Sequence, residues 1–194
     1  MVEPRQSDER NMGTPCRAVF LDRDGVVNQG VVRDGKPYPP QTVRELRLLP
    51  KVEEAVGKLK KHGFSVIVVT NQPDVRTGVQ RLEVVEEMHR KLMEWLPLDA
   101  IKVCCHTDDD GCDCRKPKAG MILAAANEYG IDLSASFMVG DRWRDIAAGN
   151  RAGCHSFFVD YGYDERRPEG DYETVSGLPD AVDKIVESSF PNGG

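Results

Sequence analysis

The chain has 194 residues, of which 40% are hydrophobic and 30% are charged, and its formal net charge is −6. This size and this balance are typical of one soluble globular domain, or of a domain with a small insert, with a substantial buried core. The negative charge argues against a protein that binds mainly nucleic acid, because phosphate backbones select basic surfaces. No apolar run approaches the roughly 18–20 residues that a membrane span requires.

The beginning of the chain differs from the rest. Residues 1–15 are polar and lack the apolar core of a signal peptide. We expect them to form a disordered tail, as chain termini often do. The folded domain is then expected over residues 16–190.

Segments with strand character alternate with segments of helical periodicity. Apolar β-branched runs such as SVIVVT predict strands, and apolar residues three or four apart predict helices. In chain order we predict a strand at Arg17–Asp22, a helix from Val52 that stops at Gly63, a strand at Ser65–Thr70, a helix from Leu82 that ends at Pro97, a strand at Ala100–Cys105, a helix at Lys118–Tyr129, a strand at Ser136–Gly140, a helix at Trp143–Arg151, a strand at His155–Asp160 and a helix at Leu178–Ser188. This order predicts an α/β fold, a doubly wound parallel sheet with helices on both faces.

Two long stretches lack such patterns and are interpreted as loops. They cover Gly25–Pro50 and residues 161–177. Long connections are usually functional or partly structured, and we expect the first to shape the mouth of a site. No segment is long enough for a separate cap domain. His62 and His89 occur in helical surface contexts, and we expect both to be solvated.

Polar side chains follow the predicted strands where each one ends. Asp22 and Asp24 end the first strand, Thr70 ends the second, and Asp141 follows the fourth. Lys116 precedes the third predicted helix. The carboxyl ends of parallel strands meet at one edge of a sheet, where α/β proteins bind their ligands. We therefore expect these five side chains to converge.

Such a group suits phosphoryl transfer. Mg²⁺ prefers oxygen ligands, and Asp22 and Asp141 with a backbone carbonyl would form part of its shell. A cation is needed because anionic oxygens shield the phosphorus from a carboxylate nucleophile. Lys116 and the Thr70 hydroxyl could hold the phosphoryl oxygens. Asp24 could protonate the leaving alkoxide and later deprotonate a water.

Four short motifs in this order resemble those of the haloacid dehalogenase (HAD) superfamily of phosphatases. They are Asp22-Arg23-Asp24-Gly25, Thr70-Asn71, Arg115-Lys116 and Gly140-Asp141 with Asp145. The resemblance covers about residues 17–160. It implies that Asp22 becomes an aspartyl phosphate, that Asp24 is the acid/base, and that Mg²⁺ is held by Asp22, Asp141 and the backbone carbonyl of Asp24. We expect Asp145 to contact the metal or Lys116 only indirectly.

A cluster of cysteines predicts a second metal site. The ligand-x-ligand pairs Cys104-Cys105-His106 and Cys112-Asp113-Cys114 suit a tetrahedral Zn²⁺ held by Cys104, His106, Cys112 and Cys114. Four protein ligands close the shell, so this zinc is expected to be structural, within a loop at residues 104–114. The alternative is a set of reduced cysteines without metal. Reduced, clustered cysteines also indicate the cytoplasm.

The zinc loop narrows the resemblance to a small branch of the superfamily, whose members dephosphorylate a heptose bisphosphate or histidinol phosphate. The segments LDRDGVVN, VVTNQ, CDCRKPKAGM and VGDRWRDI carry this likeness. It implies a substrate pocket formed by Gly30, Val31, Val32, Arg33, Asn71, Gln72, Pro73, Arg115 and Arg142. One departure is that Pro73-Asp74 follows Thr-Asn-Gln, where the branch usually has Ser-Gly or Asp-Gly.

These observations predict a Mg²⁺-dependent phosphomonoesterase. Its expected substrate is a small phosphorylated metabolite, by resemblance the 7-phosphate of D-glycero-D-manno-heptose 1,7-bisphosphate, with histidinol phosphate as the nearest rival. A nucleic-acid end-phosphatase or a metal-bound scaffold without activity would also fit parts of the pattern. The acidic composition disfavours the former, and the second carboxylate of Asp24 disfavours the latter. We expect a monomer without nucleic-acid or membrane partners.

Overall fold

The computed structural model describes residues 16–33 and 36–189. Its centre is a six-stranded sheet in the order β5-β4-β1-β6-β7-β8, in which all neighbouring strands are parallel. The strands are β1 (Ala18–Leu21), β4 (Ser65–Asn71), β5 (Ala100–Cys104), β6 (Phe137–Gly140), β7 (His155–Val159) and β8 (Glu173–Val175). The predicted doubly wound parallel sheet is confirmed, and the predicted tail lies outside the described residues.

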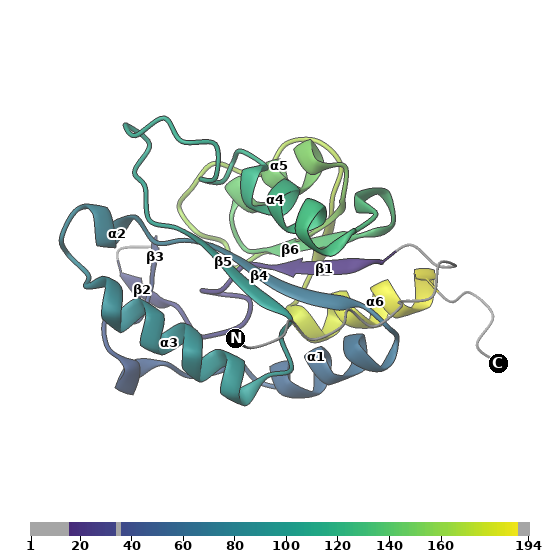
Figure 1. The fold of residues 1–194 in the computed structure, drawn as a ribbon. Helices are drawn as coiled ribbons and strands as arrows, with labels where there is room; N and C mark the ends of the chain where they lie inside the picture. Colours follow the sequence, from purple (N-terminus) through teal and green to yellow (C-terminus); the bar gives the residue numbers. More distant parts are fainter. Residues whose placement is uncertain (1–15, 34–35, 190–194) are drawn as a thin grey trace, which may run out of the picture.

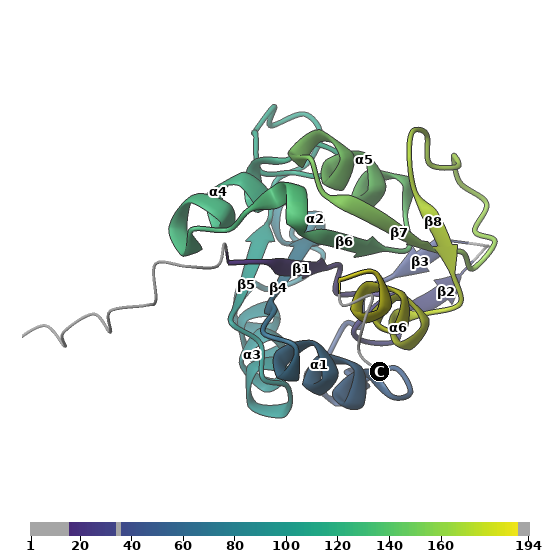
Figure 2. The ribbon, with the colours of Figure 1, turned by 90° about the vertical axis from the view of Figure 1, so that its right-hand side faces the viewer.

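Helices cover both faces of the sheet, as Figures 1 and 2 show. On one face lie α1 (Val52–Lys61), α3 (Leu82–Trp95) and α6 (Leu178–Ser189), and on the other lie α4 (Gly120–Tyr129) and α5 (Trp143–Ala152). The alternation along β1 explains the two layers, because successive strand residues point to opposite faces. Val19 and Leu21 belong to the core under α1 and α6, whereas Ala18 and Phe20 belong to the core under α4.

The first long connection is more ordered than the sequence indicates. It contains an antiparallel hairpin, β2 (Val31–Arg33) with β3 (Lys36–Tyr38), and a short 3₁₀ helix, η1 (Val43–Glu45). The expectation of a long, partly structured connection over Gly25–Pro50 therefore holds, but the sequence does not locate these short elements. Three-residue strands are too short to display a period of two, so the pattern carries no strand signal there. Within its described residues, this connection holds only these small elements between β1 and α1.

The second long connection also contains a strand. β8 pairs with β7 at the edge of the sheet through Phe158↔Thr174 and its neighbours. The prediction of a loop over residues 161–177 is wrong at these positions for the same reason of length. The sequence pattern also misses two short helices, α2 (Pro73–Arg76) and the 3₁₀ helix η2 (Leu133–Ala135). Proline suits the first position of α2, where a backbone N–H lacks a helical partner.

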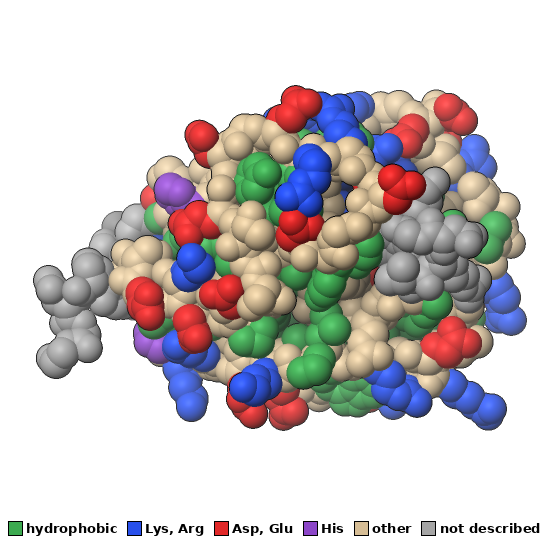
Figure 3. Space-filling view, turned by 180° about the vertical axis from the view of Figure 1, so that it is seen from behind, with side chains coloured by type: hydrophobic (Ala, Val, Ile, Leu, Met, Phe, Trp, Pro, Cys, Tyr) green, Lys and Arg blue, Asp and Glu red, His purple; other side chains and the backbone are tan. Residues whose placement is uncertain are grey.

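Charged side chains of both signs are interspersed on the face in Figure 3, between patches of apolar surface. No helix among residues 16–33 and 36–189 is long and apolar enough to cross a membrane.

Candidate active site

The carboxyl ends of the central strands bring the predicted polar residues together. Asp22 follows β1, Thr70 lies near the end of β4, and Asp141 follows β6. Lys116 reaches the same point from the connection between β5 and α4. A cavity of about 270 Å³ opens there, lined by Asp22, Asp24, Tyr38, Pro39, Thr70, Asn71, Pro73, Asp74, Lys116, Arg142, Arg144, Asp145 and Glu165. The predicted convergence is therefore observed.

Lys116 is the buried cation at the centre of this site, with 2% of the residue exposed. Its Nζ donates to Asp22 Oδ1 at 2.5 Å and to the carbonyl oxygen of Val69 at 2.7 Å. It also forms a direct ion pair with Asp145 Oδ1 at 2.6 Å, so the expectation that Asp145 contacts Lys116 only indirectly is wrong. The spacing along α5 places Asp145 one helical turn after Asp141, but it carries no sign that Lys116 reaches this turn from another element. Burial alone would lower the pKa of Lys116, but the charges of Asp145 and Asp22 outweigh it and raise that pKa above its ordinary value.

The backbone around Lys116 is clamped to the neighbouring strand. The Asn71 side chain donates to the Lys116 carbonyl oxygen at 2.9 Å and accepts from the Lys116 N–H at 3.1 Å. These two bonds tie the lysine to the end of β4. The role of Asn71 in the structure is thus to fix the position of Lys116, while it also lines the cavity.

Three carboxylates face one another beside this lysine. Oxygens of Asp22, Asp141 and Asp145 all lie within 4.8 Å of one another. Burial raises the pKa of Asp22 to about 7 against the lowering effect of Lys116, and burial with the charge of Asp22 raises the pKa of Asp141 well above its usual range. Three acidic groups beside one ammonium leave room for more positive charge, so the arrangement could hold a divalent cation.

Asp141 is oriented by its surroundings. Its Oδ2 accepts from the Tyr163 hydroxyl at 3.0 Å, whereas its buried Oδ1 has no hydrogen-bond partner among the described residues. Gly25, with φ of +94°, passes so close that a Cβ there would lie 2.0 Å from Asp141 Oδ2. Only glycine fits both this approach and this backbone conformation. The turn after β1 and the loop that carries Tyr163 therefore shape the acidic site together.

Asp24 is held by four hydrogen bonds from side chains. Arg23 donates to both of its oxygens, at 3.1 and 3.2 Å. Gln72 Nε2 donates to Asp24 Oδ2 at 2.8 Å and to Thr70 Oγ1 at 2.9 Å, and Asn28 Nδ2 donates to Asp24 Oδ1 at 2.9 Å. Because Thr70 Oγ1 accepts from Gln72, its own O–H is left to donate elsewhere. Asp24 still lines the cavity.

His89 contributes to this network from α3. One of its ring nitrogens lies 3.1 Å from Arg23 NH1, and the residue is partly buried. The expectation that His89 is solvated is therefore wrong. The helical period places His89 next to the exposed face of α3, which is why the sequence indicates a solvated side chain. Arg23, in the turn after β1, contacts it across 66 residues of sequence, and no local pattern records that contact.

The predicted pocket residues are divided by the structure. Asn71, Pro73 and Arg142 line the cavity, and Gln72 lies behind it against Asp24. Gly30 and Val31 are not among the residues that line it, and the side chains of Val32 and Arg33 lie outside the described residues. Arg115 turns toward the cysteine loop, where it donates to the His106 carbonyl oxygen at 3.1 Å and to Asp108 at 2.9 Å.

Several lining residues escape the sequence pattern. They are Tyr38, Pro39, Asp74, Arg144 and Glu165. The remaining lining residue, Asp145, belongs to the fourth motif and to the group of three carboxylates. Arg142 forms an ion pair with Glu165, and Arg144 donates to Asp108 at 3.0 and 3.1 Å. Glu165 lies in an irregular loop without a motif, so the sequence offers no signal for it. Arg144 could have been found from its place in the VGDRWRDI segment.

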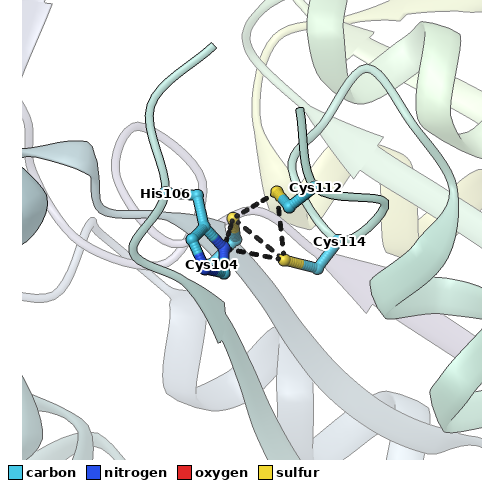
Figure 4. Close-up of side chains that lie close together, drawn as sticks. All are labelled: Cys104, His106, Cys112 and Cys114. Carbon is cyan, nitrogen blue, oxygen red and sulfur yellow. Dashed lines mark hydrogen bonds between the residues drawn. The ribbon is translucent and has the colours of Figure 1, made fainter. Parts of the chain in front are cut away.

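The cysteine cluster forms as the spacing predicts (Figure 4). The three sulfurs of Cys104, Cys112 and Cys114 lie 3.2–3.7 Å apart. His106 Nδ1 is 3.3 Å from the Cys114 sulfur and 3.5 Å from that of Cys104. A tetrahedral zinc with Zn–S bonds of about 2.3 Å would separate its sulfurs by about 3.8 Å, so these four side chains could hold one.

Comparisons with known proteins agree with this architecture. The HAD-hydrolase-like family model matches residues 113–187. A D-glycero-beta-D-manno-heptose-1,7-bisphosphate 7-phosphatase of Pseudomonas aeruginosa is 38% identical over 149 residues, which are 74% of this chain and 81% of that relative. A D-glycero-D-manno-heptose-1,7-bisphosphate 7-phosphatase of Thermosynechococcus vestitus is 35% identical over 184 residues, 87% of this chain and 90% of the relative.

A solved structure is similar over nearly the whole domain. The D,D-heptose 1,7-bisphosphate phosphatase of B. bronchiseptica, complexed with magnesium and phosphate, has a TM-score of 0.76 and 31% identity, and covers 89% of this chain and 99% of that one. The sheet, its acidic edge and these matches define a HAD-like hydrolase. Because the relatives are similar over most of their own length, the chain belongs to the family of HAD-like phosphatases that contains the heptose-1,7-bisphosphate 7-phosphatases.

Proposed function

We propose that the protein removes the 7-phosphate of D-glycero-D-manno-heptose 1,7-bisphosphate by transferring the phosphoryl group to Asp22. The observation that carries this proposal is the position of the Asp22 carboxylate. It lines the cavity beside a buried lysine, and the second carboxylate, that of Asp24, also lines this cavity. The substrate comes from the relatives that bear this name.

Mg²⁺ fits the acidic group. The buried Asp141 Oδ1 has no partner among the described residues, and the Lys116 ammonium alone does not balance three carboxylates within 4.8 Å of one another. We propose Asp22, Asp141 and the backbone carbonyl of Asp24 as its ligands. Asp145 is not proposed as a ligand, because it forms an ion pair with Lys116. When bound, the ion neutralises charge on the phosphoryl oxygens and so favours attack by a carboxylate.

The side chains would then act in two steps. In the first, an Asp22 oxygen attacks phosphorus while Lys116 and the Thr70 hydroxyl hold phosphoryl oxygens, and the departing sugar alkoxide takes a proton from Asp24. In the second, Asp24 takes a proton from a water that attacks the acyl phosphate. This releases inorganic phosphate and restores the Asp22 carboxylate.

The rim supports a bisphosphate substrate. Arg142 and Arg144 line the cavity and could contact a second phosphate, although their ion pairs with Glu165 and Asp108 would have to open. Asp74 and Glu165 could accept hydrogen bonds from sugar hydroxyls. The same two carboxylates would also suit an ammonium group, which favours histidinol phosphate as the second candidate substrate.

We further propose that Cys104, His106, Cys112 and Cys114 hold a structural Zn²⁺. The cluster of three sulfurs and one imidazole nitrogen supports this ligand set. Lys116 follows Cys114 by two residues, so a loop held together by zinc would fix the position of the Lys116 ammonium in the cavity.

The test compares substrates and a nucleophile variant. We expect the highest kcat/KM for the heptose bisphosphate among that sugar, histidinol phosphate and a 5′-phosphorylated oligonucleotide. Asp22→Asn should lower phosphate release by roughly a thousandfold or more, because loss of a nucleophile removes the covalent route. Asp183→Asn, the same change at an exposed ion pair with Lys58, is the matched control and should retain activity. Undiminished activity of Asp22→Asn would refute the mechanism.

A further inference from the structure

Arg23 is an unusual residue for its position, because it is charged and completely buried. It has 0% exposure and follows Asp22 directly in the turn after β1. A buried guanidinium is costly unless its donors find partners. The structure gives Arg23 two such partners, the carboxylate of Asp24 on one side and the ring of His89 on the other.

The chemistry of the two groups fixes the direction of the second contact. A guanidinium can only donate, so His89 Nε2 must accept the hydrogen bond from Arg23 NH1. The His89 ring is then neutral and carries its proton on Nδ1. Burial, followed by the charge of Arg23, lowers the pKa of His89 to about 4, which agrees with a neutral ring.

The helix that carries His89 is firmly placed. The neighbouring Met88 is fully buried, and Val85 and Leu92 pack on the same side of α3. Leu92 and Met88 belong to the core that lies between α1, α6 and the sheet. His89 Nε2 is therefore held at a defined point beside the Arg23 guanidinium, on a segment that is 66 residues away in sequence.

We propose that His89 is a positioning residue for Asp24, in that it fixes the guanidinium of Arg23 and through it the orientation of the Asp24 carboxylate toward the cavity. Arg23 spans the gap by donating from NH1 to His89 and from Nε and NH2 to Asp24. Without the acceptor on α3, the guanidinium could turn in its plane and release one Asp24 oxygen. This inference deepens the proposed function and rests on it, since it concerns the acid/base step.

Leaving groups separate this role from a merely structural one. A sugar alkoxide needs a proton as it departs. The leaving group of an activated aryl phosphate is a stable aryloxide, such as the p-nitrophenolate of p-nitrophenyl phosphate, and it departs without a proton. Because kcat/KM includes only the steps up to departure of the leaving group, it isolates the protonation. A misplaced Asp24 should therefore affect sugar phosphates much more than aryl phosphates.

The experiment uses the full chain with His89→Leu and His89→Gln. His89→Leu should lower kcat/KM for the sugar phosphate about tenfold or more beyond its effect on p-nitrophenyl phosphate, with a smaller change in KM than in kcat. His89→Gln, whose amide oxygen can accept from Arg23, should restore most of the loss. His62→Leu, at the end of α1 and not among the residues that line the cavity, is the control and should match the unchanged protein.

Equal losses on both substrates, or no rescue by glutamine, would overturn the role of His89 while the proposed phosphatase activity stands. An unchanged protein without phosphatase activity would instead remove the proposed function and the inference with it. Nitrogen NMR of the unchanged protein gives a test that does not need the variants to fold. It should show His89 as the neutral Nδ1–H tautomer, and a protonated Nε2 would contradict the proposal.

Discussion

At the scale of single residues, the site depends on a few close approaches that allow little change. Gly25 illustrates this, because a positive φ coincides there with an approach to Asp141 that leaves no room for a methyl group. Lys116 is comparable, since its buried ammonium is stabilised by the carboxylates of Asp22 and Asp145 beside it. Both residues belong to motifs that the sequence itself reveals.

Replacement of Gly25 by alanine should therefore impair the acidic site. The new Cβ would push Asp141 away and force a left-handed backbone on an L residue, so we expect weaker Mg²⁺ binding, loss of most activity and a drop in unfolding free energy of about 1–3 kcal/mol. Magnesium titration calorimetry and urea unfolding would measure these effects.

The matched control for this change is Gly57→Ala. Gly57 lies inside α1 with nothing within 4 Å of an added Cβ, so alanine there should raise stability by about 0.5–1 kcal/mol and leave activity unchanged. A Gly25→Ala protein as active as Gly57→Ala would show that Asp141 can move without consequence.

His89 also predicts how stability depends on pH. Its pKa in the folded protein is lowered to about 4, below the ordinary value of 6.5, so the unfolded chain binds more protons between these values. Stability from this group is therefore complete above pH 6.5 and is lost as the pH falls toward 4, by up to about 3 kcal/mol.

The difference in unfolding free energy between the unchanged protein and His89→Gln should accordingly shrink as the pH falls from about 7 to about 4.5. Denaturant unfolding at several pH values measures this difference. Subtracting the two free energies removes the contributions of the other titrating groups, which the two proteins share. A difference that is constant across this range would mean that His89 titrates normally.

At the scale of elements, the cysteine loop is connected to the cavity through side chains as well as through the chain. Arg115 binds both the His106 carbonyl oxygen and Asp108, and Asp108 in turn binds Arg144 on α5, which lines the cavity. Lys118 donates to the Gly111 carbonyl oxygen at 2.9 Å. The cysteine loop is thus connected by side-chain hydrogen bonds to the segment before α4 and to α5.

Opening this loop should reduce catalysis without touching the cavity directly. Cys112→Ser should abolish stoichiometric zinc and lower kcat, because Lys116 and Arg144 would lose a fixed support. Cys105→Ser, at a neighbouring cysteine outside the cluster, is the control and should keep both metal and activity. Elemental analysis with steady-state kinetics tests this, and zinc-free protein of full activity would contradict it.

At the scale of the whole molecule, the parts that the sequence predicts are those with local signals. The strands β1, β4 and β6 are short apolar runs with polar groups at or just after their carboxyl ends, and parallel pairing then places those groups at one edge. The proposed zinc ligands likewise follow from close spacing along a single loop. The parallel sheet needs no further information than the βαβ alternation and the resemblance.

The remaining parts depend on contacts between distant segments. Tyr163 reaches Asp141 from an irregular loop 22 residues away, and His89 meets Arg23 across 66 residues. The two hairpin strands and β8 each have three residues, too few for an alternating pattern, and they are stabilised by pairing with a neighbouring strand. No periodicity records such contacts, so these features emerge only from the folded molecule.

The proposed covalent step at Asp22 can be tested directly by quenching the enzyme in acid during turnover of the heptose bisphosphate and mapping the protein by peptide mass spectrometry. We predict one phosphoryl group on the Asp22 side chain, with more of it in an Asp24→Asn variant, because that variant lacks the base that activates water. A phosphoryl group on another residue, or none at Asp22 in protein that is turning over substrate, would contradict transfer to this carboxylate.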